Sequence, residues 1–298
     1  MLRIVLSLIL SAVLILPSLA SGLNIAATTT NMAMLSEAVG GDQVSVTVMA
    51  PPDRDTHHLD VRPNMMVALR RADLVVAVGA ELEVGWLPPA IQGAGNARVN
   101  PGRQGYFEAA AQVPLIGQVP DADRSMGDVH PMGNPHVYLD PLRMGEIARA
   151  LAVRLAALAP EHAAQFEANA MAFNETMQRN AIVWREQAAG APGVLLFHFD
   201  ARYLLQLLDV PVLGYLEPVP GVPPTGRHLN ALVNELRERQ GVMIANPWHG
   251  SRGPEFIQRE LGWPVAVLPT NVPVGGDVDD YVALLQQWVD ALTSPRAP

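Results

Sequence analysis

The stretch that decides the fold is Leu74-Val75-Val76-Ala77-Val78-Gly79, in which five apolar residues in succession end at a glycine. An unbroken apolar run of this length is typical of a strand that is buried on both faces of a parallel sheet. Two further β-rich runs precede it, at residues 23–27 and 44–49, and helical spacing separates them. This alternation of strand and helix predicts an α/β lobe.

A long helix is predicted in the middle of the chain. Apolar residues recur at helical spacing from Met144 to Leu158, and after Pro160 they continue at spacings of three and four as far as Trp184. The sequence Gly190-Ala191-Pro192-Gly193 then ends the pattern. About thirty residues of helix span roughly 45 Å, which is enough to cross a whole lobe. We therefore interpret residues 160–189 as a rigid connector.

Strands and helices alternate again after this connector. Apolar runs at 194–198, 242–245 and 265–268 predict strands, and helical periods lie between and after them. The predicted fold class is α/β, with two lobes built on parallel-type sheets and joined by one long rigid helix. We expect the N-terminal lobe at residues 21–159 and the C-terminal lobe at residues 190–298.

The first twenty residues have the pattern of a secretory signal peptide. A basic start at Arg3 is followed by an almost unbroken apolar run over residues 4–16, and the small residues Ser18 and Ala20 come next. The apolar run is too short to span a membrane. We expect residues 1–20 to be removed by cleavage after Ala20, which places the mature protein in the periplasm.

The composition excludes several functions. The chain has no cysteine, so a lipid-anchored form and thiolate metal ligands are not expected. Its formal net charge is −9, and it carries no basic cluster, so it is a poor candidate for binding nucleic acid or anionic membranes.

Four segments carry the residues that could perform chemistry. They are residues 53–60, 133–141, 197–200 and 268–271, and the first three contain histidines. All but the second follow predicted parallel strands, where ligands bind in open α/β sheets. Neutral imidazole is a common ligand for zinc, which favours four positions. The spacing alone is weak evidence, because no short metal-binding motif occurs.

The order of these motifs resembles the zinc- and manganese-binding solute-binding proteins of ABC importers. The resemblance is carried by residues 55–63, 69–79, 133–141, 197–200 and 217–225, which run in order along nearly the whole mature chain. It implies two α/β lobes joined by one long helix, with the metal in the cleft between the lobes. This agrees with the fold that the apolar pattern predicts.

The resemblance also implies the metal ligands. They fall on His57, His136 and His198, with His58 as the rival of His57. The family often has an aspartate as the fourth ligand after the last strand, where this chain has Asn271. The expected set is therefore His57, His136, His198 and Asn271, with water or His249 as alternatives for the fourth position.

Two further residues have open roles. His130 lies in the segment where many zinc-binding members carry a long histidine- and acid-rich loop, and we interpret it as a plain loop histidine rather than as a collector of metal. Glu217 lies in a proline-rich turn. It is expected either to accept a hydrogen bond from a ligand imidazole or only to fix that turn.

The predicted function is a periplasmic zinc carrier without catalytic activity. Three neutral imidazoles suit Zn2+, whereas manganese prefers carboxylate oxygen. The resemblance implies delivery of zinc to an ABC permease and ATPase in the inner membrane, with a periplasmic metallochaperone as a further partner, and we expect a monomer. The alternatives are a manganese carrier of the same type, an adhesin, and a zinc hydrolase with Glu217 or Asp200 as general base.

Overall fold

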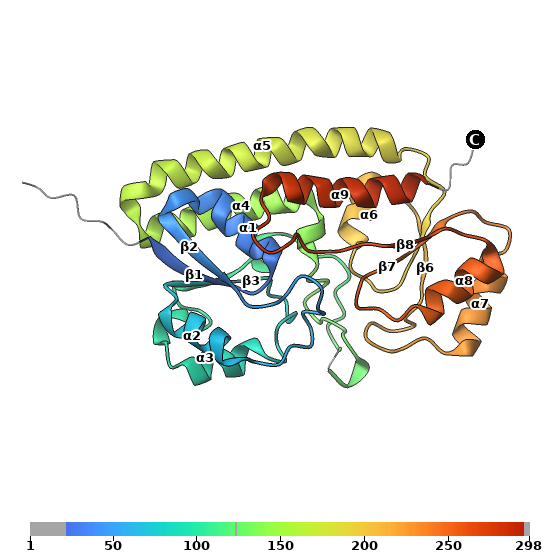
Figure 1. The fold of residues 1–298 in the computed structure, drawn as a ribbon, viewed down its shortest axis with the longest axis horizontal. Coiled ribbons are helices and arrows are strands. Elements are labelled where there is room, and N and C mark those ends of the chain that lie inside the picture. The colour runs from blue at the N-terminus through green and yellow to red at the C-terminus, as the bar shows by residue number, and fades with distance from the viewer. Residues whose placement is uncertain (1–21, 123, 295–298) are drawn as a thin grey trace, which may run out of the picture.

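The computed structural model describes residues 22–122 and 124–294 (Figure 1). The predicted signal peptide and its cleavage site lie outside these residues. Within them, no helix is long and apolar enough to cross a membrane.

The N-terminal lobe is built on a parallel sheet of four strands. They are β1 (Leu23–Ala27), β2 (Val44–Val48), β3 (Leu74–Ala77) and β4 (Tyr106–Glu108), in the order β2-β1-β3-β4. All four residues of β3 are buried, as its apolar run predicts. Helices α2 (Pro63–Arg71) and α3 (Leu87–Ala94) cover one face of this sheet, and α1 (Thr30–Gly40) and α4 (Pro141–Leu158) cover the other.

The C-terminal lobe repeats this arrangement. Its strands are β5 (Val194–Leu196), β6 (Val212–Tyr215), β7 (Val242–Ala245) and β8 (Val265–Val267), all parallel and in the order β6-β5-β7-β8. Helices α7 (Gly226–Leu236) and α8 (Arg252–Leu261) pack on one face, and α6 (Arg202–Leu208) lies on the other. The predicted α/β class with two parallel sheets is confirmed.

The predicted connecting helix is present, although its first turn differs. Residues Pro160–His162 form a 3-10 turn, and the α-helix α5 then runs from Ala163 to Ala188. The proline at residue 160 starts this turn rather than the α-helix itself. Helix α5 lies along both lobes (Figure 1). We propose residues 21–159, 160–189 and 190–298 as the division of the chain into lobe, connector and lobe.

The last helix, α9 (Val278–Thr293), also runs between the lobes. It packs against α5 and α1, and the Trp184 Nε1 atom of α5 donates to the Gln286 Oε1 atom of α9 at 2.8 Å. One buried hydrophobic cluster therefore extends from Ile25 of the first sheet to Val194 of the second and includes Trp288. The two lobes share a core in addition to the connecting helix.

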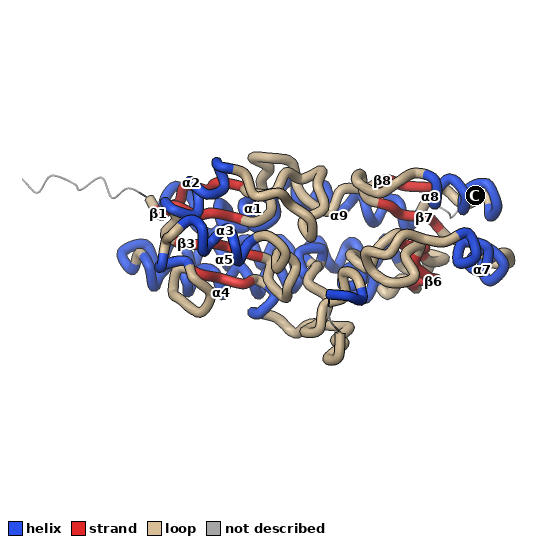
Figure 2. The backbone as a smooth tube through the Cα atoms, turned by 90° about the horizontal axis from the view of Figure 1, so that it is seen from below, coloured by secondary structure: helices blue, strands red, loops and turns tan. Residues whose placement is uncertain are grey.

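Several short elements were not predicted from the sequence. Strand β4 has three residues, β6 is only half buried and contains Gly214, and α3 has prolines as its second and third residues, so each gives a weak periodic signal. The loops also hold short 3-10 turns at Gly41–Gln43, Ala97–Val99, Ala110–Gln112, Arg124–Met126 and Val137–Leu139. Seen from below, loops gather between the lobes, where the strands of both sheets end (Figure 2).

Candidate metal centre

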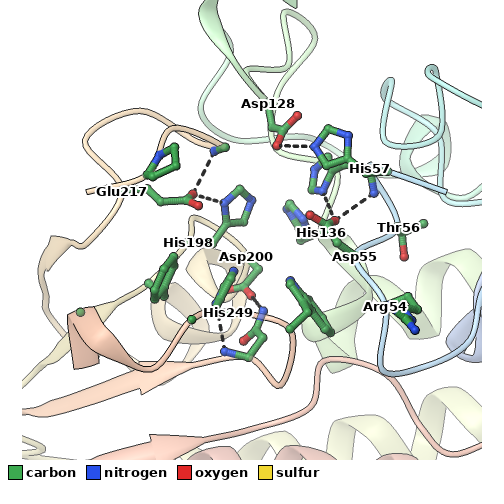
Figure 3. A pocket seen from close by; sticks show the side chains of 18 of the residues that line it. Arg54, Asp55, Thr56, His57, Asp128, His136, His198, Asp200, Glu217 and His249 are labelled. Atoms are coloured by element: carbon green, nitrogen blue, oxygen red, sulfur yellow. Dashed lines mark hydrogen bonds and ion pairs between the residues drawn. The ribbon is translucent and has the colours of Figure 1, made fainter. Parts of the chain in front are cut away.

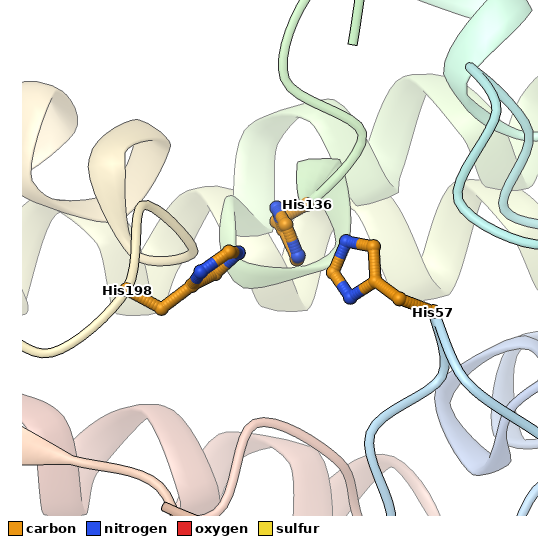
Figure 4. Close-up of side chains that lie close together, drawn as sticks. All are labelled: His57, His136 and His198. Carbon is orange, nitrogen blue, oxygen red and sulfur yellow. The ribbon is translucent and has the colours of Figure 1, made fainter. Parts of the chain in front are cut away.

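Three histidines from distant parts of the chain converge between the lobes. His57 lies in the loop after β2, His136 just before α4, and His198 two residues after β5. Their ring centroids are 5.3 to 5.5 Å apart, and one nitrogen of each lies within 4.8 Å of the others (Figure 4). The structure thus brings together the three histidines that the sequence singles out.

Each of these rings is held through its Nδ1 atom by an oxygen acceptor. His57 Nδ1 donates to Asp55 Oδ1 at 2.7 Å, and His198 Nδ1 donates to Glu217 Oε2 at 2.7 Å. His136 Nδ1 donates to Asn134 Oδ1 at 2.8 Å. These acceptors assign the ring proton to Nδ1 in all three, which leaves Nε2 as the atom that carries the lone pair, and the Nε2 atom of His57 faces that of His130 at 3.2 Å. Such acceptors orient metal-binding imidazoles and raise their basicity.

The roles of Asp55 and Asn134 were missed in the sequence, although a local signal exists. Each lies two residues before its histidine, and its side chain also accepts the backbone N–H of that histidine, at 3.0 Å for His57 and 2.9 Å for His136. This is the Asx-turn geometry that Asp and Asn favour. The spacing Asp-x-His and Asn-x-His therefore fixes a ring as well as a turn.

Asn134 also connects the two lobes at the site. Its Nδ2 atom donates to the Phe199 carbonyl oxygen at 2.6 Å, and its own carbonyl accepts from the Tyr203 hydroxyl at 2.6 Å. The residue that orients His136 therefore also holds the loop that carries His198. This arrangement limits how far the two rings can separate.

The titration behaviour of the rings follows their surroundings. Burial lowers the pKa of His136 well below its ordinary value, and the neighbouring histidines lower it further. Burial also works against the charged form of His198, but the hydrogen bond to Glu217 and the nearby carboxylates outweigh it and raise the pKa of His198. For Asp55, burial is opposed by the hydrogen bond and charge of His57, and the net pKa lies well below the ordinary value.

Asn271 offers an oxygen atom to the same cleft. Its Oδ1 atom is buried and stands alone, among buried side-chain nitrogen and oxygen atoms in the described part of the chain, in having no hydrogen-bond partner. An unpaired buried acceptor typically costs about 1–3 kcal/mol, which a cation bound to that oxygen would offset. Asn31 of α1 holds the segment from both sides, with Asn31 Nδ2 donating to the Thr270 carbonyl at 2.8 Å and Asn31 Oδ1 accepting from the Val272 N–H at 3.0 Å.

The alternative ligand His249 is engaged elsewhere. Its Nδ1 atom accepts the backbone N–H of Asn246 at 3.1 Å, so the neutral ring carries its proton on Nε2. The ring stacks on Phe197 at 3.9 Å between centroids, and burial lowers the pKa of His249 to about 4. Its lone pair is therefore already used, which favours Asn271 over His249.

His130 lies closer to the site than a plain loop histidine would. Its Nε2 atom is 3.2 Å from the Nε2 atom of His57. Burial, followed by the charges of the neighbouring histidines, lowers the pKa of His130 to about 3. Two nitrogens on one tetrahedral zinc ion, each bonded at 2.0–2.1 Å, are separated by about 3.4 Å. His130 is thus a second candidate for the fourth position.

The histidines lie in a cleft of about 690 Å³ that both lobes line (Figure 3). The two carboxylates considered as general bases are occupied there. Glu217 Oε2 accepts from His198 and from the Gly221 N–H at 2.9 Å, while Asp200 accepts from Asn246 Nδ2 and from the Ala201 N–H. Both carboxylates are thus held by hydrogen bonds to protein groups at the edge of the cleft.

This fold and this cleft define a class of two-lobed metal-binding proteins. The chain belongs to the family described as the periplasmic component A of the zinc-uptake complex, which matches residues 25–294. Members of this family are the substrate-binding components of metal ABC importers, which work with a membrane permease and an ATPase.

Known relatives differ in the metal that they are named for. The high-affinity zinc uptake system protein ZnuA of Yersinia pestis is 23% identical over 285 residues, covering 86% of each chain. A manganese ABC transporter substrate-binding lipoprotein of Streptococcus gordonii is 26% identical over 94% of this chain and 91% of its own length. A crystal structure of a ZnuA deletion mutant with zinc bound has a TM-score of 0.77 at 22% identity, covering 93% of this chain and 99% of that chain. This structural likeness establishes the fold.

Proposed function

We propose that this protein is the periplasmic zinc-binding component of an ABC importer, and that it carries zinc in the cleft to the membrane permease. The proposal rests on one observation above the others. Three histidines converge with every Nδ1 atom bonded to an oxygen acceptor, so three Nε2 lone pairs remain for a metal ion. Zinc is the ion that such a neutral imidazole set suits.

The proposed ligands are His57, His136, His198 and Asn271. The unpartnered Oδ1 atom of Asn271 supports its place in this set. His57 is favoured over His58, because the His57 ring lies 5.3 Å and 5.5 Å from the rings of His136 and His198, whereas most of the His58 side chain is exposed.

Manganese is the competing cargo, since one relative is named for it. Manganese prefers carboxylate and water ligands. The carboxylates of Asp55 and Glu217 bond to the Nδ1 atoms of candidate ligands rather than standing free. The donor set therefore supports zinc, acting as cargo of a non-catalytic carrier. We propose that the carrier is monomeric and that a periplasmic metallochaperone can supply it.

Competition between the two metals tests this function. The mature protein is stripped with a chelator, loaded with equimolar zinc and manganese, and analysed for bound metal by elemental analysis. We expect about one tightly held zinc per chain and at least about a hundredfold preference over manganese, or 2.7 kcal/mol. Equal or tighter manganese binding would overturn zinc as the cargo, and turnover of ester, phosphate or peptide substrates by the zinc form would overturn the carrier.

A further inference from the structure

A second cluster of metal-binding side chains lies beside the three histidines. It consists of Asp55, His58 and Asp128, each of which offers one ligand atom within 4.8 Å of the others. His58 Nε2 is 3.2 Å from Asp128 Oδ2. The His58 side chain is 60% exposed, whereas that of Asp128 is 8% exposed. The cluster therefore has a buried carboxylate on one side and a histidine open to solvent on the other.

We propose that Asp55, His58 and Asp128 form a second, outer site for a divalent transition-metal ion such as zinc. One imidazole and two carboxylates are a mixed nitrogen and oxygen set that zinc accepts, and solvent can complete the coordination. The two carboxylates carry two negative charges. A dication is therefore attracted to this cluster more strongly than to a neutral set of side chains.

The position of Asp128 supports a cation site rather than a simple surface ion pair. The Asp128 N–H donates to the Pro220 carbonyl at 2.8 Å, so the loop of the N-terminal lobe touches the proline-rich turn of the C-terminal lobe. Glycines allow this contact, because a Cβ atom at Gly221 would collide with the Asp128 carboxylate and one at Gly127 would collide with Pro220. The contact buries the Asp128 carboxylate.

Burying a carboxylate is unfavourable unless a cation or hydrogen-bond donors compensate. The ion-pair partner that the structure gives Asp128 is His58, whose exposed ring makes a weak partner, since exposed pairs contribute only about 0–1 kcal/mol. A bound dication would compensate the buried charge more fully.

The outer site adjoins the inner one. Asp55 belongs to the outer cluster and also accepts from His57 Nδ1 at 2.7 Å, and the rings of His57 and His58 are 6.1 Å apart. An ion in the outer site would thus be bound by Asp55, the same carboxylate that orients the proposed inner ligand His57. A role in feeding the inner site rests on the proposed function, whereas binding at the outer site does not.

Counting the metal ions bound per chain tests the proposal. Metal-free mature protein is titrated with zinc by calorimetry, and bound zinc is measured after equilibrium dialysis. We expect two equivalents in the wild type, the second weaker than the first. His58→Ala and Asp128→Asn should each weaken the second event by at least about tenfold and leave the first unchanged. The matched control is Asp53→Asn, an exposed acid of the same loop outside the cluster, which should retain both events.

The variant His136→Ala separates this proposal from the proposed function. It should weaken the tight event by at least about tenfold and leave the outer event unchanged. If the wild type binds zinc only at the weaker site, that result would count against the proposed function and not against the outer site. Absence of the weaker equivalent in the wild type, or a weaker equivalent that survives both His58→Ala and Asp128→Asn, would overturn the outer site. Because His58 is exposed, its variant is expected to fold normally even if Asp128→Asn does not.

Discussion

The Nδ1 atom of His198 lies 2.7 Å from Oε2 of Glu217, and the same oxygen accepts the backbone N–H of Gly221 at 2.9 Å. Glu217 therefore ties the ring of a candidate ligand to the proline-rich turn of the C-terminal lobe. The sequence left open whether Glu217 orients an imidazole or only fixes the turn, and the structure gives it both contacts.

Glu217→Gln should weaken zinc binding by about tenfold or more, the range found when such acceptors are removed. The amide can still accept a hydrogen bond, but its lost charge makes the imidazole less basic. The pKa of His198 should fall in the metal-free variant, because the bond to Glu217 and its charge raise that pKa. Zinc titration and an NMR titration of the ring measure the two effects. An unchanged His198 pKa would indicate that Glu217 only fixes the turn, and Glu255→Gln, at an exposed site on α8, is the control.

His136→Ala and His198→Ala should each weaken tight zinc binding by at least about tenfold, or 1.4 kcal/mol. Each change removes one of three converging Nε2 lone pairs. His57→Ala should have a larger effect on the tight event than His58→Ala, because the His57 ring faces the other two rings. Calorimetry on the stripped proteins measures these constants. Normal tight binding in both His136→Ala and His198→Ala would reject the assigned site, and a larger loss in His58→Ala would reverse the choice between the adjacent histidines.

Asn271→Asp should tighten zinc binding and improve manganese binding by a larger factor. The change keeps the shape of the side chain and adds a negative charge in a partly desolvated cleft, where Coulomb attraction exceeds that in water. Carboxylate oxygen also suits manganese better than an amide does. Titration with both metals gives the two ratios. If neither affinity changes, Asn271 does not bind the ion, and His130→Ala then tests the other candidate for the fourth position.

Zinc should stabilise the protein against heat. The candidate ligands come from both lobes, so a bound ion ties the two lobes together. With zinc at a thousandfold over its dissociation constant, linkage gives about 4 kcal/mol. At roughly 2–4 °C per kcal/mol for a chain of this size, the melting temperature should rise by about 8–16 °C. Melting curves after chelation and after zinc re-addition provide the measurement, and identical curves would contradict ligation across the cleft.

His130 should make the metal-free protein sensitive to acid. Its folded pKa of about 3 lies below the ordinary value of 6.5, so below pH 6.5 the unfolded chain takes up a proton that the folded protein does not. Stability that is present at pH 7 is therefore lost as the pH falls. Relative to His130→Gln, the wild type should lose about 2 kcal/mol of unfolding free energy between pH 7 and pH 5. Urea unfolding at both pH values measures this, and equal losses in the two proteins would contradict it.

The sequence by itself determined the architecture, because strands buried on both faces leave a continuous apolar run and helices leave apolar residues at spacings of three and four. Strand β7 and the end of helix α8 fall where the pattern places them. The same patterns are weak in short or half-buried elements such as β4 and β6, which therefore escaped prediction. The resemblance then supplied candidate site residues that spacing alone could not select.

Only the tertiary structure decided how the site is assembled. The Asn31 hydrogen bonds to residues 270 and 272 join positions about 240 apart in sequence, and no local pattern encodes such a pairing. The hydrogen bond from Asn134 to the Phe199 carbonyl and the contact between His130 and His57 also join residues that are far apart in the sequence. Local periodicity indicates which face of an element is buried, whereas the convergence of side chains from separate elements depends on how those elements pack against one another. The ring nitrogen that His198 leaves for metal therefore follows from its folded contact with Glu217, whereas at His57 and His136 the acceptor lies two residues before the ring.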